Sequence, residues 1–527
     1  MSLLRSNVVV ATGTALSRAT GLARVVVFGY VIGQTALADA YTIGNETPNI
    51  VYELLIGGVL SATLVPMFTS FLEHDDEEST NVVITVTLVV LAAVTGVAVI
   101  AAPWIFGLYT LDPAAGVDSD QLHEVGTMLT RVFLVQIFFY GATALASAVL
   151  NSRRRFFAAA WSPILANLII IATLLSLPDA GERTWTLSDV LTDDRLRWTL
   201  ALGTTGGIAA MALVLVPAVH RAGLHFRPDL RFRHPAVSRL LRLSAWTLGF
   251  VVANQVTIVV VRNLADPGSG DARAYFVAFT FFVLPHGLLA VSIATTFAPE
   301  MARSVARRDR RAFCDQASLG VRLIAVLTVP AGVLLFVLRR AIVGALLQHG
   351  EYTAANADRA ARALGGFALG LVGFSVYLFV LRGFYAHQDT RTPFVINVVQ
   401  NALNIALAIA LVGRYDIGGL GVALAVSYVV CALWALQVLR YKVPGFPTRD
   451  VLASLWRMVL AGVIAGEVTW LIARQVGSNE GTGGVTRVIV GAVVGLAVYL
   501  GVLALLRAPE LLSAWTRLTR RKPVPAS

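Results

Sequence analysis

Two arginines lie in the middle of an apolar stretch near the N-terminus. The run from Val8 to Gly33 is long enough to cross a bilayer as a helix, yet the segment ALSRATGLARVVVFG places Arg18 and Arg24 inside it. An arginine at the centre of a membrane helix costs about 2.5–3.5 kcal/mol on insertion scales, so the pair should face a cavity or a partner. Because guanidinium groups match phosphate oxygens in bidentate fashion, these residues predict binding of a phosphorylated or carboxylated ligand.

The spacing of the two arginines suggests how they are presented. Arg18, Gly21 and Arg24 are three residues apart, which predicts one slightly drifting stripe on a helix. Gly21 removes bulk between the arginines, so the helix could bend there or another group could approach closely.

The second apolar segment supplies acids that could balance this charge. Asp39, Glu46 and Glu53 are seven residues apart, on one face of a continuous helix, with Asn49 close to that face and Pro48 interrupting it. Two interpretations stay open, a ligand site balanced by neighbouring acids or a salt-bridge network that locks the first helix to the second. For Asp39 and Glu53 the residues themselves favour the structural role.

The second half of the chain offers fewer polar candidates. Arg262 lies near the end of an apolar segment, and His286 follows Pro285 in a long one. Asn397 and Asn401 belong to a polar stripe that could bind a cation or sugar hydroxyls, although hydrogen bonding between helices is the simpler explanation.

Composition sets the fold class. The 527 residues are 57% hydrophobic and 14% charged, and the mean hydropathy is +0.73, which predicts an all-α polytopic membrane protein. Fourteen transmembrane helices are expected at roughly 6–33, 36–71, 81–109, 126–150, 157–177, 198–219, 240–262, 274–302, 318–347, 363–386, 392–412, 416–439, 452–473 and 484–506. Pro48 and Pro285 are expected to kink the second and eighth of these segments.

The loops predict the orientation. Alternate loops and the C-terminal tail are rich in arginine, which makes that side cytoplasmic and places both termini there. The acidic loop at 73–81 breaks the pattern, but acidic residues contribute little to orientation. The net charge of +11 is therefore read as a sign of cytoplasmic loops, not of nucleic-acid binding. Cys314 and Cys431 are the only cysteines, so neither a disulfide nor a thiolate metal site is expected.

The chain also repeats itself weakly. VLSATLVPMF resembles VSIATTFAPEM, with Pro66 matching Pro299, and Asn167 matches Asn401 in a second pair of segments, at offsets of about 233 to 237 residues. Six spans fit that period, which predicts a parallel repeat about an axis along the membrane normal, with a central cavity between the lobes. The expected division is a first six-helix lobe at 1–220, a second at 221–440, and two further helices with a basic tail at 441–527.

No enzyme signature is found in the sequence. It contains no nucleotide-binding glycine loop, no HExxH and no cysteine or histidine cluster. Phosphate binding without hydrolytic machinery indicates transport.

Four segments together resemble one known family. LSRATGLARVVVFG, ADAYTIGNETPNIVYELLIGGVLSATLVPMF, LLQHGEYTAANADRAARAL and GFYAHQDTRTP are similar to the MurJ (MviN) lipid II flippases of the MOP exporter superfamily. The NIVYELLIGGVL version resembles an actinobacterial branch. The resemblance implies a bacterial plasma-membrane protein that exports a lipid-linked peptidoglycan precursor by alternating access. It implies that Arg18 and Arg24 line the cavity and engage the diphosphate, that Asp39 is functionally important, and that the last two helices form a groove for the polyprenyl tail.

The sequence departs from the family at several charged positions. Many relatives carry a basic residue where this chain has Tyr52, an acid where it has Gly57, an arginine where it has Thr280 and an acid where it has Val25. Binding of the substrate's phosphate groups should therefore depend more heavily on Arg18 and Arg24 of the first helix. The predicted substrate-binding residues are Arg18, Arg24, Asp39, Asn49 and Glu53, and the candidate pathway-lining residues are Glu46, Tyr52, Arg262, His286, Asn397 and Asn401.

The expected partners are lipid II or a related polyprenyl-diphosphate lipid, membrane lipids and cell-wall synthesis proteins, with no nucleic acid, and the chain is expected to be monomeric. No cofactor or metal is expected, because the membrane potential or an ion gradient would drive transport. Four alternatives stay open. They are a flippase for another polyprenyl-diphosphate glycan, a drug or cation antiporter of the same superfamily, a non-transporting scaffold for cell-wall synthesis, and a polyprenyl-phosphate glycosyltransferase.

Overall fold

The computed structural model describes residues 3–54, 64–178, 184–224, 226–508 and 510, with their side chains except at 3–11, 50–54, 66, 239 and 241–251. All regular secondary structure of the described residues is helical. By its internal contacts the chain divides into two units. Unit 1 comprises Met1–Arg273 and His349–Thr353, and unit 2 comprises Ala274–Gln348 and Ala354–Ser527.

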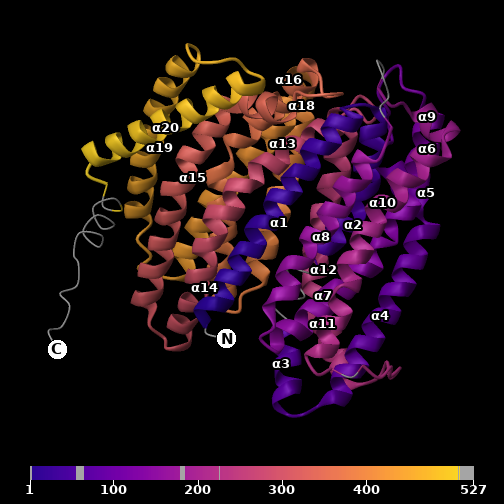
Figure 1. The fold of residues 1–527 in the computed structure, drawn as a ribbon. Coiled ribbons are helices and arrows are strands. Elements are labelled where there is room, and N and C mark those ends of the chain that lie inside the picture. Colours follow the sequence, from indigo (N-terminus) through magenta and orange to yellow (C-terminus); the bar gives the residue numbers. More distant parts are fainter. Residues whose placement is uncertain (1–2, 55–63, 179–183, 225, 509, 511–527) are drawn as a thin grey trace, which may run out of the picture. The chain divides into compact units, whose positions relative to one another are not determined.

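Unit 1 contains twelve complete helices among its described residues, shown from indigo to magenta in Figure 1. They are α1 (Leu3–Ile32), α2 (Ala36–Leu54), α3 (Val65–Glu73), α4 (Glu77–Ile100), α5 (Ala102–Leu108), α6 (Ser119–Leu134), α7 (Gln136–Ser152), α8 (Phe156–Leu175), α9 (Leu187–Thr192), α10 (Asp194–Leu213), α11 (Leu215–Arg221) and α12 (Pro235–Asn263). Helix α1 packs on α8, and α2 packs on α6 and α7.

Helix α13 (Asp271–Pro285) begins in unit 1 and continues into unit 2. Unit 2 then contains a five-residue π-helix, η2 (His286–Ala290), followed by α14 (Val291–Ala306), α15 (Arg310–Leu347), α16 (Ala354–Ala368), α17 (Leu371–Ala386), α18 (Arg391–Lys442), α19 (Thr448–Ala473) and α20 (Gly481–Leu505). Helices α19 and α20 pack on each other and on α15. Pro285 therefore marks a break in the expected eighth segment, whereas α2 remains helical through Pro48.

The prediction of an all-helical polytopic membrane protein is confirmed. Within the described residues, ten helices are long and apolar enough to cross a membrane, or eleven if the bent pair α16–α17 counts as one span. The 52-residue α18 contains two of the segments expected from the sequence, which meet at Asp416, where the backbone is not helical (φ 47°, ψ −142°). The total of fourteen spans stays a prediction, as does the division of the chain at 220 and 440.

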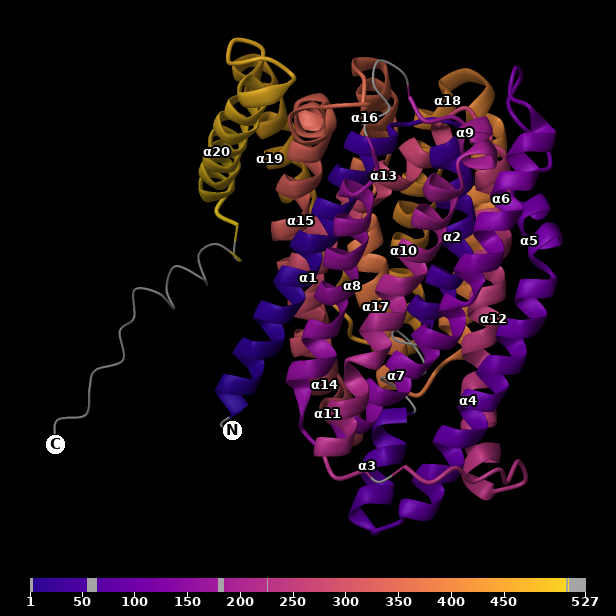
Figure 2. The same ribbon diagram turned by 45° about the vertical axis from the view of Figure 1, so that its right-hand side comes forward.

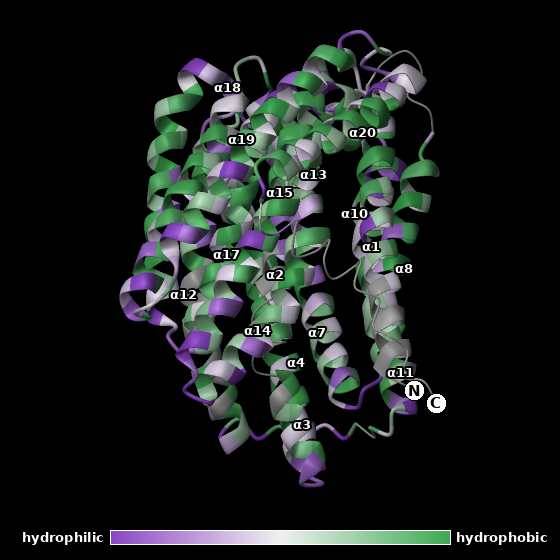
Figure 3. Cartoon of the chain, turned by 90° about the vertical axis from the view of Figure 1, so that its left-hand side faces the viewer, coloured by the Kyte–Doolittle hydropathy of each residue, from purple (hydrophilic) through white to green (hydrophobic). Residues whose placement is uncertain are grey.

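Apolar surface on the long helices fits a lipid environment. Figure 3 shows hydrophobic residues along the helices and hydrophilic ones at their ends, plainly so at α3. Ile100, Trp104 and Ile489 are large apolar residues with more than half of their surface exposed, which is unusual for a water-soluble monomer.

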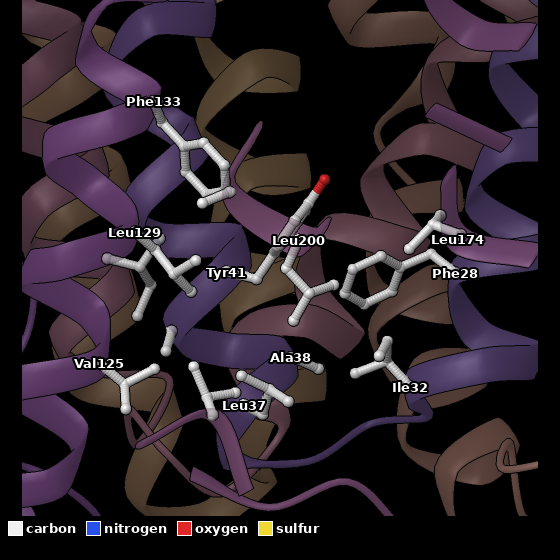
Figure 4. Packing of buried hydrophobic residues seen from close by; sticks show 14 of the residues in the cluster. Phe28, Ile32, Leu37, Ala38, Tyr41, Val125, Leu129, Phe133, Leu174 and Leu200 are labelled. Atoms are coloured by element: carbon white, nitrogen blue, oxygen red, sulfur yellow. The ribbon is translucent and has the colours of Figure 1, made fainter. Parts of the chain in front are cut away.

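Buried aromatic and aliphatic residues hold α1 and α2 in unit 1. The ring of Tyr41 lies 4.7 Å from that of Phe28 and 5.1 Å from that of Phe133, and Figure 4 shows all three among leucine, isoleucine and valine side chains. The Tyr41 hydroxyl hydrogen bonds Thr204 on α10, so this buried phenol is satisfied. This core fixes the part of α1 that follows the two arginines.

The two halves of the chain share local backbone features at a constant offset. Asp75 and Arg308 both have positive φ, of 51° and 57°, and so do Arg154 and Gln388, at 56° and 57°. The first pair is 233 residues apart and the second 234. In each half, the aspartate after the first of these residues caps the next helix, with Asp76 accepting from Ser79 and Asp309 accepting from Ala312. Such residues mark corresponding helix boundaries, because non-glycine residues rarely adopt positive φ.

The glycines of the last helix permit close packing. A Cβ added at Gly491 would lie 2.8 Å from Leu338, and one added at Gly495 would lie 2.5 Å from Thr469. Both distances are too short for a real contact, so the GxxxG spacing lets α20 approach α15 and α19 closely.

The HQDTRTP turn ties the start of α18 to its far end. Asp389 accepts hydrogen bonds from the backbone and hydroxyl of Thr392, at 3.0 and 2.7 Å, and pairs with Lys442 at 2.6 Å. Although partial burial opposes it, the bonds from Lys442 and Thr392 lower the pKa of the Asp389 carboxyl to about 2. The motif therefore has a clear structural role within unit 2.

We predict that Asp389→Asn destabilises the protein by about 0.5–1 kcal/mol, since the pair is partly exposed. A lowered pKa stabilises the folded state fully above the unfolded value of about 3.9, and this contribution is lost as the pH falls through about 2. Thermal unfolding at several pH values should show a constant gap between the wild type and the variant above about pH 4, closing below it. Asp315→Asn, an exposed change of the same charge, should show no such gap, and equal behaviour of the two variants would contradict the assignment.

Candidate functional site

The two mid-helix arginines lie on an uninterrupted part of α1. Arg18 and Arg24 are both half-buried, and α1 is helical from Leu3 to Ile32. Six residues of α-helix separate the two Cα atoms by about 9 Å along the axis and about 120° around it. The expected single stripe is therefore wrong in detail, because the two Cα positions lie about 120° apart around the helix and do not share one narrow face.

Neither arginine is neutralised within the described part of unit 1. No hydrogen bond or ion pair joins Arg18 or Arg24 to another described residue of that unit. Arg24 also lies within electrostatic range of Tyr41 and of a further arginine, Arg273. A membrane helix that carries two such cations favours an anion beside it.

Gly21 does not create the close approach expected of it. A Cβ at this position would meet only the Asn167 amide nitrogen, at 3.6 Å, which is an ordinary contact. Asn167 instead joins α8 to α1, because its amide donates to the carbonyl of Ser17 at 3.2 Å and the hydroxyl of Thr20 at 3.1 Å. These two bonds contact α1 on either side of Arg18 and fix the helix there.

Asp39 has a structural position at the start of α2. It is fully buried, and its carboxylate accepts from the backbone N–H groups of Gly268, Gly270 and Arg273 at 2.9, 2.8 and 2.7 Å. Three backbone donors satisfy most of what a buried carboxylate requires. Asp39 thus holds the loop before α13, and a direct role in substrate binding stays a prediction.

Glu46, the second acid of α2, also has its partner outside α1. Glu46 forms an ion pair with the buried Arg262 of α12, whose guanidinium also donates to the carbonyl of Ala272 at 2.8 Å. The expected salt-bridge network between the first two helices is therefore not found among the described residues. The acids of α2 instead hold residues 262–273, which leaves the arginines of α1 without a partner from Asp39 or Glu46.

Of the remaining candidates in unit 1, the structure describes the side chain of Asn49 but not those of Tyr52 and Glu53. Asn49 accepts a hydrogen bond from the Tyr140 hydroxyl at 2.9 Å and donates to the carbonyl of Asn45 at 2.8 Å, so it connects α2 to α7. Tyr52 and Glu53 lie outside the described side chains, and Gly57 lies outside the described residues. Their predicted roles stay predictions.

In unit 2, the predicted pathway residues are buried and hydrogen bonded. His286 begins η2, and its Nδ1 lies 3.0 Å from the hydroxyl of Ser375 on α17. Asn401 donates to the carbonyl and side-chain oxygens of Asn397 at 3.1 and 3.2 Å. These contacts fit the interpretation of hydrogen bonding within the membrane. The Thr280 hydroxyl donates to the carbonyl of Phe276 in its own helix at 2.9 Å.

Sequence reasoning missed the segment His349–Thr353, which belongs to unit 1. The backbone N–H of Glu351 donates to the carbonyl of Tyr30 at 3.0 Å, at the end of α1. Gly33 and Gly350 permit this contact, because both have positive φ and each would clash there if it carried a Cβ. The sequence feature that could have indicated this contact is the QHGEYTA motif, which contains the segment. Among the described residues, no group of histidine, cysteine and acidic side chains could hold a metal ion.

We predict that Asp39→Asn destabilises the loop at 264–270, because an amide replaces one acceptor oxygen with a donor that opposes a backbone N–H. The cost should be about 1–3 kcal/mol, measured by thermal unfolding, with faster amide exchange at Gly268 and Gly270. Asp266→Asn removes the same charge at an exposed position that tolerates asparagine, and it should leave both measurements unchanged. Equal exchange in the two variants would show that Asp39 does not hold the loop.

Comparison with known proteins identifies the fold and the family. A solved structure titled "Lipid II flippase MurJ, inward closed conformation" matches with a TM-score of 0.77 and 21% identity, covering 95% of this chain and 98% of the other. An inward-facing multidrug resistance MATE family transporter of the MOP superfamily matches with a TM-score of 0.65 and 13% identity, covering 82% of this chain and 96% of the other. Both likenesses concern the fold.

Sequence relatives agree with this fold. A probable lipid II flippase MurJ of Vibrio cholerae is 26% identical, over 89% of each chain, and a lipid II flippase MurJ of Burkholderia cenocepacia is 26% identical, over 89% of this chain and 90% of its own. The family model described as Lipid II flippase MurJ matches residues 28–483, a region that begins after Arg18 and Arg24. The chain therefore belongs to the MurJ family of lipid II flippases, which are membrane transporters and not enzymes.

Proposed function

We propose that this protein moves lipid II from the cytoplasmic to the outer leaflet, and that Arg18 and Arg24 bind its diphosphate. The observation that carries this proposal is the state of those arginines. They are half-buried in the middle of α1 and have no hydrogen bond or ion pair with a described residue of unit 1. A lipid II substrate is also what the family implies.

The chemistry of the ligand follows from that of the two side chains. Each guanidinium can donate two parallel hydrogen bonds to phosphate oxygens. Their separation of about 9 Å along α1 is within the combined reach of two long arginine side chains, so both can contact one extended anion. A diphosphate of charge about −2 would neutralise the pair, which supports its choice over a neutral or cationic substrate.

The proposed architecture has fourteen spans, two six-helix lobes at 1–220 and 221–440, a central cavity, and both termini in the cytoplasm. The recurrence of capping aspartates and positive-φ residues at offsets of 233 and 234 supports the repeat. The last two helices, α19 and α20, would carry the polyprenyl tail. The actinobacterial branch suggested by NIVYELLIGGVL belongs to the same proposal.

Alternating access would couple binding to movement. Neutralised arginines would let the lobes close and reopen outward, and the empty, positive cavity would return. An inside-negative potential favours outward movement of a −2 charge by about 4–5 kcal/mol per 100 mV if the charge crosses the whole field. The membrane potential or an ion gradient would therefore supply the driving force.

We predict that Arg18→Ala combined with Arg24→Ala abolishes lipid II flipping in proteoliposomes, because the diphosphate loses its charged donors. Unfolding should change little, since neither side chain contacts a described residue of unit 1 through a hydrogen bond or ion pair. Arg131→Ala with Arg195→Ala, two exposed positions in the same unit, removes the same charge and should flip normally. Continued flipping by the first double variant would overturn the proposal, and a scaffold role would then fit better.

We also predict that flipping responds to voltage. An inside-negative diffusion potential should accelerate outward movement of lipid II in proteoliposomes, and reversing the potential should slow it, because the substrate carries net negative charge across the field. A lipid-linked glycan with a single phosphate should respond about half as strongly, as its charge is smaller. Rates that ignore the potential would contradict movement of the diphosphate through the field.

A further inference from the structure

We propose that the loop between α11 and α12 is a docking surface for anionic membrane lipids. The loop alternates apolar and basic residues in the sequence FRPDLRFR, at 226–233. Figure 2 shows it crossing the end of unit 1 at which α3 turns into α4. This inference is independent of the proposed function, because it concerns neither α1 nor the flipped substrate.

The backbone of the loop is fixed along the first turns of α4. The N–H groups of Arg227 and Asp229 donate to the side chains of Asn81 and Thr85, both at 3.0 Å. Arg231 pairs with Glu78 at 2.6 Å and with Asp229 at 2.5 Å. These bonds hold the loop at a defined position at the end of the helices. The charge of Arg231 is compensated within the protein by Glu78 and Asp229.

Three large apolar side chains of the loop are not packed in the protein. Phe226, Leu230 and Phe232 are 44%, 60% and 52% exposed. A loop held at a helix end in water would have little reason to present them together. Aromatic and aliphatic side chains at this level are typical of the membrane interface, where they insert below the headgroups.

The basic residues between them supply the headgroup contacts. Arg227 and Arg233 are exposed, and neither guanidinium has an ion pair or hydrogen bond among the described residues. An open hollow of about 430 Å³ lies along residues 231–235. Arg154 and Arg155 extend the charge, because their neighbour Arg153 donates to the carbonyl of Ala222 at 2.6 Å, just before the loop.

This combination of charge and apolar surface selects one partner. Phosphodiester headgroups complement the free guanidiniums, and acyl chains cover the phenylalanine and leucine side chains, so an anionic phospholipid fits both features. The sequence-based orientation places the loop at the cytoplasmic leaflet, where anionic lipids give the surface a negative potential.

The experiment uses the full chain in nanodiscs, with an environment-sensitive fluorophore at Phe232→Cys. Cys314 and Cys431 are buried and would be replaced by serine. Spin-labelled lipid should quench the fluorophore strongly, and more strongly when phosphatidylglycerol replaces part of the phosphatidylcholine. The same label at Ala306→Cys, the exposed last residue of α14 in unit 2, without large exposed apolar neighbours among the described residues, should be quenched weakly.

Charge variants separate the contributions. Arg227→Gln with Arg233→Gln should reduce the preference for phosphatidylglycerol by about 30-fold, at about fivefold per arginine, whereas Arg307→Gln with Arg311→Gln, two exposed residues of unit 2, should leave it unchanged. Three results would each overturn the proposal. The first is equal quenching at the two label positions, and the second is quenching that does not depend on phosphatidylglycerol. The third is that inorganic phosphate, added to phosphatidylcholine discs, changes the fluorescence of the label as much as phosphatidylglycerol does. A blue-shifted label that lipid cannot quench would indicate a protein partner instead.

Discussion

The cost of holding charge inside a membrane shapes unit 1. Each buried ion must be compensated by an opposite charge or by directed hydrogen bonds. Asp39 is compensated by three backbone N–H groups, and Glu46 and Arg262 compensate each other. Arg18 and Arg24 differ from these residues, because the described part of the unit offers them no such partner. Under the proposed function, the substrate would supply the anion that these two cations do not find among the described residues of the unit.

The same constraint explains the ion pair that joins α2 to α12. Loss of a buried partner leaves an uncompensated charge, which is more costly than loss of an exposed pair. The Asp39 and Glu46 contacts therefore fix α2 to the segment 262–273, while the core around Tyr41 joins α2 to α1 through Phe28 and to α10 through Thr204. These contacts fix the part of α1 that follows its two arginines.

Much of the fold could be predicted from the sequence, because apolar runs of bilayer length identify membrane helices directly. The partners of the charged residues could not be predicted. The seven-residue spacing correctly placed Asp39 and Glu46 on one helical face, but it gave no information on which element that face meets. The partners lie more than 200 residues away, at Arg262, in the loop before α13 and at Arg273 in its first turn. The close approach predicted at Gly21 was wrong for a similar reason. Spacing alone does not show that Asn167 lies opposite this glycine at an ordinary contact distance.

The most direct measurement is the binding of an undecaprenyl diphosphate lipid to the protein in nanodiscs, compared with its monophosphate. If the two arginines hold the diphosphate, the wild type should bind it more tightly than the monophosphate, and Arg18→Ala with Arg24→Ala should lose at least about 100-fold in affinity, since each charged hydrogen bond contributes about 1.5–3 kcal/mol. Equal affinity of the wild type and the double variant for the diphosphate would contradict the account.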